Sequence, residues 1–178
     1  MVRLLGFQAI TKGDTPEFTL LFCLVGVPVK LKMLIKYNSR DLVCKTPFGA
    51  VITDEQITFR VYIDSGTYVH WIKINFINAN NDFHNEKYLN YWGNENGYNK
   101  FLCEVSIKNP QIYYYYFEIE TEYGKFIGKC ADGELILDEQ YPPWQLTVYD
   151  KASAAPEWAK GGIMYQIFPD RFHKSKAY

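Results

Sequence analysis

Hydrophobic and polar residues alternate one by one through much of the middle of the chain. Every second residue is apolar in residues 56–63 and again in residues 69–77. A period of two predicts β-strands with one buried face and one solvent-facing side. The side chains expected on the buried faces of these two strands are Ile57, Phe59, Val61, Ile63, Ile72, Ile74 and Phe76.

The same alternation returns in the second half of the chain. Residues 100–108 and 112–121 each read as a strand, and in the latter the alternate positions include Glu118 and Glu120, which prefer water. The opposite set is therefore the predicted core: Tyr113, Tyr115, Phe117 and Ile119. Gly124 predicts a turn, residues 125–130 a hairpin partner, and residues 145–150 a final strand after the Pro142-Pro143 turn.

Residues 78–99 do not follow this pattern. They are rich in Asn and Gly, which favour turns and positive φ, and they predict a long polar connection. Tyr88, Tyr91, Trp92 and Tyr98 are embedded in it. Loops of this length in compact domains often carry function, so Tyr91, Trp92 and Tyr98 are candidate ligand contacts.

The number and spacing of the strands predict an all-β fold, specifically an immunoglobulin-like β-sandwich over residues 35–150. Residues 1–34 are an unassigned leader, and Met33 is a possible natural start. Residues 151–160 contain small residues and Pro156 and read as a linker. The apolar run at 162–168 is typical of a strand buried on both faces in a parallel sheet, so residues 161–178 predict the start of another domain.

Composition narrows the functional classes. Lys plus Arg number 19 against 20 acidic residues, a net charge of −1, which argues against nucleic-acid binding. Aromatic residues make up 17% of the chain, with 15 Tyr, 12 Phe and 4 Trp. Aromatic rings fill β cores and also stack on the apolar faces of sugars, so both roles stay open for each ring.

The cysteine spacing predicts that the chain has no zinc site, and the N-terminal residues predict that it has no membrane-spanning helix. Cys23, Cys44, Cys103 and Cys130 contain no C-x-x-C pair, so the usual zinc spacings are absent and free thiols are favoured over disulfides. The apolar run 18–29 is shorter than the ~20 residues of a membrane-spanning helix. Acidic residues rather than a positive charge precede it, unlike a signal peptide, so we expect a cytoplasmic location and no membrane contact.

Four segments resemble a known family. Residues 156–172 (PEWAKGGIMYQIFPDRF) are similar to the start of the catalytic barrel of glycoside hydrolase family 13, the α-amylase family, in its neopullulanase, cyclomaltodextrinase and maltogenic amylase group. Residues 37–41 (YNSRD), 46–51 (TPFGAV) and 144–150 (WQLTVYD) resemble the N-terminal sandwich of those enzymes, which belongs with family 34 carbohydrate-binding modules. The resemblance covers about residues 35–172.

The resemblance implies an accessory domain of a retaining hydrolase acting on α-glucans, followed by a (β/α)8 barrel truncated just after its first strand. The family's catalytic carboxylates stand on later barrel strands, so we expect no catalytic residue and no activity in this chain alone. Asp170 and Arg171 read either as substrate contacts or as a structural ion pair. Relatives often bind calcium after this point, but here two lysines follow His173, so we expect no cofactor and no metal.

A free-standing α-glucan-binding module is the alternative function. Its candidate sugar-binding residues are Trp71, on the solvent-facing side of its strand, and Tyr91, Trp92 and Tyr98. Burial of Trp71 against the missing barrel or a partner chain is the competing role. The expected partners are α-glucan oligosaccharides, the catalytic barrel and a second copy in a homodimer. An adhesion or pilus sandwich fits the strands but leaves residues 156–172 unexplained.

Overall fold

The computed structural model describes residues 4–11, 16–24, 27–78, 80, 84–153, 156–159, 163 and 166, with side chains from Met33 onward except at Glu157. The predicted all-β class is confirmed, because these residues contain no α-helix. The strands are β1 (Leu4–Thr11), β2 (Pro16–Leu24), β3 (Val27–Lys36), β4 (Lys45–Thr46), β5 (Val51–Ile52), β6 (Ile57–Asp64), β7 (Val69–Asn78), β8 (His84–Glu95), β9 (Tyr98–Val105), β10 (Gln111–Thr121), β11 (Gly124–Ala131), β12 (Glu134–Ile136) and β13 (Trp144–Tyr149).

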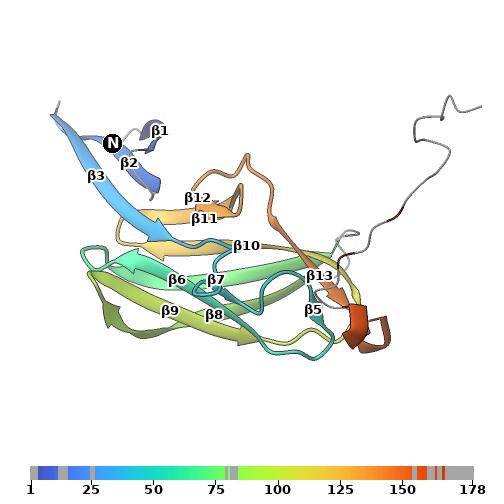
Figure 1. Ribbon diagram of the computed structural model, residues 1–178. Helices are drawn as coiled ribbons and strands as arrows, with labels where there is room; N and C mark the ends of the chain where they lie inside the picture. Colours follow the sequence, from blue (N-terminus) through green and yellow to red (C-terminus); the bar gives the residue numbers. More distant parts are fainter. Residues whose placement is uncertain are drawn as a thin grey trace, which may run out of the picture.

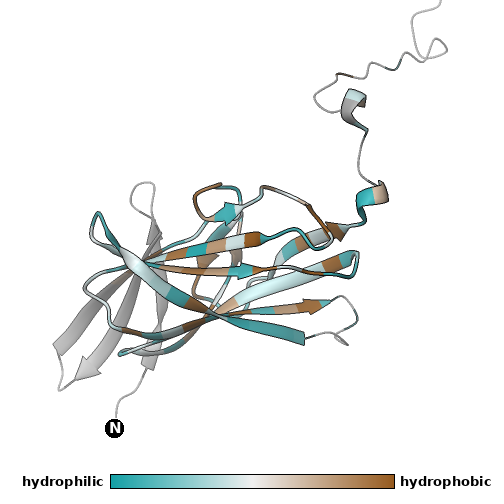
Figure 2. Cartoon of the chain, turned by 90° about the horizontal axis from the view of Figure 1, so that it is seen from below, coloured by the Kyte–Doolittle hydropathy of each residue, from teal (hydrophilic) through white to brown (hydrophobic). Residues whose placement is uncertain are grey.

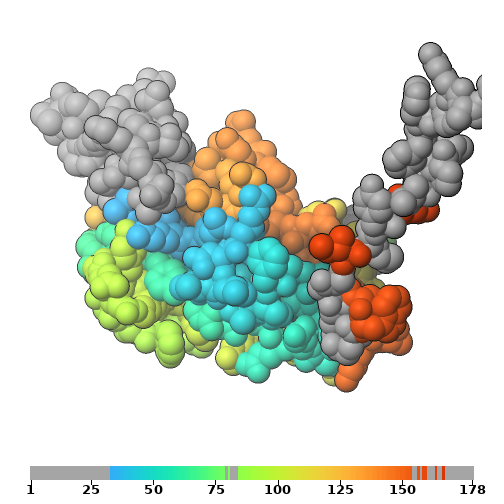
Figure 3. Space-filling model, in the orientation of Figure 1, coloured from blue at the N-terminus to red at the C-terminus, as the bar shows by residue number. Residues whose placement is uncertain are grey.

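Eight strands form a curled antiparallel sheet in the order β3-β6-β9-β8-β7-β10-β11-β12 (Figure 1). The two ends of this order nearly meet. An isolated bridge joins Asn38 to Glu134, and Leu135 N donates to Tyr37 O at 2.9 Å. In Figure 3 the light-blue residues that follow β3 lie against the orange residues around β12. The sheet is therefore a nearly closed, barrel-like structure.

The remaining strands attach to this curled sheet. β2 pairs with β3 and β1 with β2, so they extend the sheet beyond β3. β13 pairs with β10 and, in parallel, with β5, at the end where the chain continues into two 3-10 turns (Figure 1). β4 pairs with β6. The turns are η1 (Lys151–Ser153) and η2 (Glu157–Ala159), within the segment predicted as a linker.

The prediction of a long polar loop at residues 78–99 is wrong, because most of this segment forms strand β8. Only Leu89 of β8 is buried, so its side chains show no apolar alternation to mark a strand. Main-chain pairing with β7 on one side and β9 on the other holds it instead. Asn96 and Gly97, with φ of 52° and 79°, form the two-residue turn from β8 to β9 that favours Asn-Gly.

β8 also explains why the main-chain hydrogen bonds join the strands into one sheet rather than two. A loop at this place would leave β9 and β7 in separate sheets, as the two-sheet expectation for an immunoglobulin-like sandwich requires. Since β8 pairs with both, the strands follow one continuous path. What the structure establishes is the all-β class and the curled antiparallel sheet.

The predicted core faces are confirmed. In β6 and β10 the predicted core side chains are buried and their neighbours are not, as the hydropathy colours along the strands illustrate (Figure 2). In β7 Ile72, Ile74 and Phe76 are buried as predicted, but the polar Asn75 and Asn78 are buried as well. Burial of large apolar side chains contributes about 1.5–3 kcal/mol each. The fully buried positions include Phe59, Ile63, Ile72, Phe76, Tyr113, Tyr115, Phe117 and Ile119.

An aromatic cluster occupies the centre of this core. Tyr115 stacks on Trp144 with ring centroids 5.4 Å apart and an interplanar angle of 13°, and it contacts Phe59 edge-on at 5.2 Å. The Tyr37 and Tyr115 hydroxyls are hydrogen-bonded at 2.7 Å. Burial raises the pKa of both phenols, so both stay neutral. Their mutual hydrogen bond satisfies the two hydroxyl groups inside the core.

Several sequence expectations fall on residues that the structure does not describe. The predicted start of a catalytic barrel at residues 161–178, with Asp170 and Arg171, lies outside the described residues except for the exposed Ile163 and Gln166. The 1–34 leader contains β1, β2 and most of β3, and β3 continues through residue 34. None of the described helices is long and apolar enough to cross a bilayer.

The cysteines follow the sequence expectation where they are described. Cys44 and Cys103 are buried free thiols and Cys130 is a half-buried one. Burial raises the pKa of Cys103 to about 12, so this thiol is inert at neutral pH.

Candidate functional site

The four candidate sugar-binding rings do not form one site. Trp71 alternates with buried Ile72 and lies on the outward side of β7. Trp92, near the end of β8, and Tyr98, at the start of β9, also lie outside the core. Tyr91 is 61% exposed and contacts Phe101 edge-on at 5.8 Å. Among the described residues no ring-to-ring contact joins any two of the four.

Lysine side chains cover three of these four rings. The Lys125 ammonium lies 5.5 Å from the Trp71 ring centre, Lys100 5.6 Å from Trp92, and Lys36 4.1 Å from Tyr98. Such cation–π contacts stabilise the pair by about 0.5–1 kcal/mol at exposed sites. A sugar stacking on the same ring face would have to displace the lysine.

Around Trp71 the outward surface of β7 is a network of balanced charges. Lys73 Nζ lies 2.7 Å from Glu86 and 3.7 Å from Glu118, while Lys125 Nζ lies 2.8 Å from Glu118. The hydrogen bond to Glu86 raises the pKa of Lys73. Burial by itself raises the pKa of Glu118, but Lys125 and Lys73 outweigh it and lower that pKa. Every charge in this network has a partner of opposite sign.

Tyr91 faces a hollow at the end of the curled sheet where β6 turns into β7. The hollow has a volume of about 530 Å³ and is lined by Ser65, Gly66, Thr67, Tyr68, Val69, Tyr91, Asn99, Phe101 and Glu122. Tyr68 is 65% exposed, so two exposed tyrosines flank one concavity. We call it the Tyr68–Tyr91 hollow.

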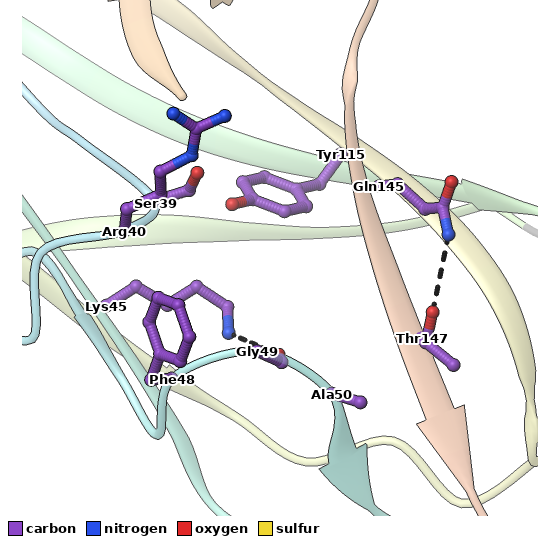
Figure 4. Close-up of a pocket in the computed structure, with 9 residues that line it drawn as sticks. All are labelled: Ser39, Arg40, Lys45, Phe48, Gly49, Ala50, Tyr115, Gln145 and Thr147. Carbon is purple, nitrogen blue, oxygen red and sulfur yellow. Dashed lines mark hydrogen bonds between the residues drawn. The ribbon is translucent and has the colours of Figure 1, made fainter. Parts of the chain in front are cut away.

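A second pocket, of about 270 Å³, lies between the loop that follows β3 and strand β13 (Figure 4). Figure 4 shows Arg40 and Lys45 on one side of the pocket and Gln145 and Thr147, joined by a hydrogen bond, on the other. The aromatic ring at its mouth is Phe48, which is exposed. We call it the Lys45 pocket.

The ammonium group of Lys45 is the main polar group of this pocket. Lys45 Nζ donates hydrogen bonds to Pro47 O at 2.9 Å and Gly49 O at 3.0 Å, which holds the loop. Figure 4 shows the second of these bonds. Burial lowers the pKa of Lys45 to about 8, although the negative charge of Glu55 opposes this. A neutral amine retains two N–H donors, so both hydrogen bonds survive deprotonation.

Stability should therefore rise with pH as Lys45 loses its proton. Between about pH 8 and pH 10 the unfolded chain holds a proton on Lys45 that the folded chain has released, so rising pH favours folding. Relative to Lys45→Met, the wild type should gain about 2 kcal/mol between pH 7 and about pH 9.5. Urea unfolding of both proteins at the two pH values measures this. An unchanged difference would contradict a lowered pKa.

Three of the four segments on which the family resemblance rests meet at the Lys45 pocket. Ser39 and Arg40 come from the YNSRD segment, Phe48 and Gly49 from TPFGAV, and Gln145 from WQLTVYD. The first two segments are neighbours in sequence, whereas Gln145 comes from the distant strand β13. The loop of the first segment is held where the sheet closes: Ser39 N donates to Gly133 O at 2.9 Å and Arg40 pairs with Asp132 at 2.7 Å. Three of the four resembling segments therefore share one place in the fold.

No metal site is found in the described part of the chain. It holds no group of three or more His, Cys, Asp or Glu side chains placed to bind an ion.

Three curated proteins are similar in sequence to the chain, all named amylopullulanase. That of Thermoanaerobacterium thermosulfurigenes is 29% identical over 151 residues, that of Thermoanaerobacter thermohydrosulfuricus 29% over 150, and that of Thermoanaerobacterium saccharolyticum 27% over 151. Each match covers 78% of this chain but 8–11% of the relative, so the chain spans about a tenth of their length. This is a distant homology over a small segment of those proteins.

Comparison with family models and with solved structures gives no further indication of fold or function. No protein-family model matches the chain. A crystal structure of an engineered protein matches it with a TM-score of 0.37 and 14% sequence identity, over 58% of this chain and 18% of that one. A likeness at that level supports no conclusion about fold or function.

Sequence reasoning missed most of the Tyr68–Tyr91 hollow and all of the Lys45 pocket. Of the hollow's aromatic residues only Tyr91 was a candidate, because Tyr68 lies in a short turn and Phe101 in a strand. A local signal existed for Lys45: its charge lies between Cys44, which is buried, and the TPFGAV segment that resembles the family.

Proposed function

We propose that this chain is an accessory β domain of an α-amylase-family enzyme that acts on α-glucans. The observation that carries the proposal is the similarity to three amylopullulanases over 78% of the chain. It is supported by the fold, which brings Gln145 of the WQLTVYD segment to the same pocket as residues of the YNSRD and TPFGAV segments.

The proposal includes the finer architecture. Residues 35–150 are an immunoglobulin-like domain of the family 34 carbohydrate-binding type, residues 151–160 a linker, and residues 161–178 the first strand of the (β/α)8 barrel. The nearly closed sheet with its own aromatic core supports an independent domain. β13 ends at Tyr149, and the chain then enters η1, in which Ala152 N donates to Asp150 Oδ1 at 2.8 Å.

In this proposal the chain contributes no catalytic residue. Retaining hydrolysis of an α-glucosidic bond needs two carboxylates about 5–5.5 Å apart across the scissile bond, and these stand in the barrel. The domain's ligands are α-glucan oligosaccharides, its neighbour is the barrel, and a second copy of the enzyme is a further partner.

The proposal is tested on the product of the whole gene. The reading frame past codon 178 should continue into a barrel, and that product should release reducing ends from amylose and pullulan. The 178-residue chain alone should release none, since it lacks the catalytic pair. A complete gene product that leaves both glucans intact would refute the proposal, and so would hydrolysis by the isolated chain.

A free-standing glucan-binding module is the second candidate. The observation that favours it is the exposure of Tyr68, Tyr91 and Trp92, at 65%, 61% and 64%, which a purely structural domain does not require. A natural stop directly after codon 178, together with glucan binding by the chain, would favour the module over the enzyme domain.

A further inference from the structure

The Tyr68–Tyr91 hollow is built as a ligand site. Its volume of about 530 Å³ lies within the roughly 300–1,000 Å³ typical of small-molecule sites. Three parts of the chain form it: the turn from β6 to β7, the adjacent strands β8 and β9, and the turn after β10. A concave surface can contact several faces of a ligand, which the flat outward surface of β7 and β8 cannot.

Both tyrosines of the hollow are held in place before any ligand arrives. Tyr68 N donates to Glu122 Oε1 at 3.0 Å, and Glu122 N donates to Tyr68 O at 3.0 Å. The Tyr68 ring packs edge-on against His70 at 5.1 Å, as the Tyr91 ring does against Phe101 at 5.8 Å. Rings fixed in this way lose little conformational entropy on binding.

The ring faces of Tyr68 and Tyr91 are also free of cations. Among the described residues no ammonium or guanidinium group lies over either ring, whereas lysines cover Trp71, Trp92 and Tyr98. Of the four rings predicted from the sequence, Tyr91 is thus the one with no lysine over its ring among the described residues.

The polar groups of the hollow suit a neutral, hydroxyl-rich ligand. Among the described residues that line it there is no Lys or Arg and Glu122 is the one charged residue, so an anion would be repelled. Ser65 supplies a hydroxyl and Asn99 an amide, groups that donate and accept hydrogen bonds as sugar hydroxyls do. Thr67 also lines the hollow, but its hydroxyl donates to Asp64. Val69 and Phe101 add apolar surface that fits the C–H faces of a pyranose.

We propose that the Tyr68–Tyr91 hollow binds a segment of α-glucan, with pyranose rings stacked on Tyr68 and Tyr91 and hydroxyls bonded to Ser65, Asn99 and Glu122. The ligand class rests on the proposed function, while the place rests on the geometry of the hollow. The site makes the domain a glucan anchor.

Isothermal titration calorimetry of the 178-residue chain with maltoheptaose and β-cyclodextrin tests the proposal. The wild type should bind at least one of the two. Tyr68→Ala and Tyr91→Ala should each raise Kd about tenfold or more, since each removes a stacking surface. Tyr91→Phe, which keeps the ring, should stay within about threefold of the wild type.

Tyr88→Ala is the matched control for Tyr91→Ala. It removes a tyrosine of similar exposure, 53%, from the same strand but from the outward surface beside Trp71. Its Kd should be unchanged. Far-ultraviolet circular dichroism of each variant confirms that the β fold is retained, so a loss of binding reports the contact rather than unfolding.

Two results would overturn the hollow as the site. One is wild-type binding that survives Tyr68→Ala and Tyr91→Ala but disappears in Trp92→Ala, which would place the site on the outward surface. The other is no heat of binding with either sugar at millimolar concentration. Neither result touches the proposed enzyme relation, which is decided separately by hydrolysis of amylose and pullulan by the whole gene product.

Discussion

Replacing Tyr115 with alanine is expected to lower the free energy of unfolding by about 3–5 kcal/mol. Tyr115 is 1% exposed, stacks on Trp144 and contacts Phe59, Phe76 and Phe117. The truncation leaves a cavity in the aromatic cluster and removes the partner of the Tyr37 hydroxyl. Because small domains are stable by about 5–15 kcal/mol, the variant should be partly unfolded in mild denaturant.

Urea unfolding followed by circular dichroism measures this loss, and two variants control for it. Tyr114→Ala removes the neighbouring tyrosine from the other side of β10, where it is half-buried, and should cost less than about 1 kcal/mol. Tyr115→Phe keeps the ring but leaves the buried Tyr37 hydroxyl without its hydrogen-bond partner. This variant should lower the free energy of unfolding by about 1–2 kcal/mol. Equal losses for Tyr114→Ala and Tyr115→Ala would contradict the assignment of the core face.

Replacing Gly133 with valine should destabilise the protein by about 3 kcal/mol, because it strains the turn that closes the curled sheet. Gly133 has a φ of +95°, and an added Cβ would lie 3.2 Å from Asn38 Oδ1. Its carbonyl accepts hydrogen bonds from Ser39 N and from Trp144 Nε1, both at 2.9 Å. A β-branched residue resists positive φ, so the turn would have to shift and loosen both bonds.

The backbone origin of this effect is checked at the same position. Asn adopts positive φ far more readily than Val, so Gly133→Asn should lose clearly less stability than Gly133→Val in urea or thermal unfolding. If the two variants unfold at the same midpoint, φ at this turn is not the cause. A drop in the near-ultraviolet signal of Trp144 should accompany the Val variant, since its indole hydrogen bond ends on Gly133.

Much of the fold follows from local patterns in the sequence. The positions Ile57, Phe59, Ile72 and Phe117 were placed correctly because strand alternation and burial coincide where one face meets the core. Glu118 and Glu120 marked the outer side of β10 for the same physical reason.

What alternation could not reveal is β8. Its residues are almost all exposed, so no hydrophobic period distinguishes them from a loop. The position of this strand depends on main-chain hydrogen bonds to β7 and β9, which are set by strands before and after it in the sequence. The Asn96-Gly97 pair was the one local signal of a hairpin here.

The candidate site shows the same limit. Aromatic content identified Tyr91, but not that Tyr68 lies across the hollow from it or that lysines cover Trp71 and Trp92. Those relations join residues from different strands, so they depend on the curled sheet. Short motifs matched the family without showing that they share the Lys45 pocket.

The exposure of β8 has an evolutionary consequence. A strand whose place depends on its backbone, with Leu89 as its one buried side chain, can exchange its other residues with little loss of packing. Neutral substitutions can therefore accumulate in β8 faster than in β6 or β10, where every second residue is buried and its truncation opens a cavity. New ligand preferences among descendants of this domain would arise most readily there, since Tyr91 can be replaced while the scaffold endures.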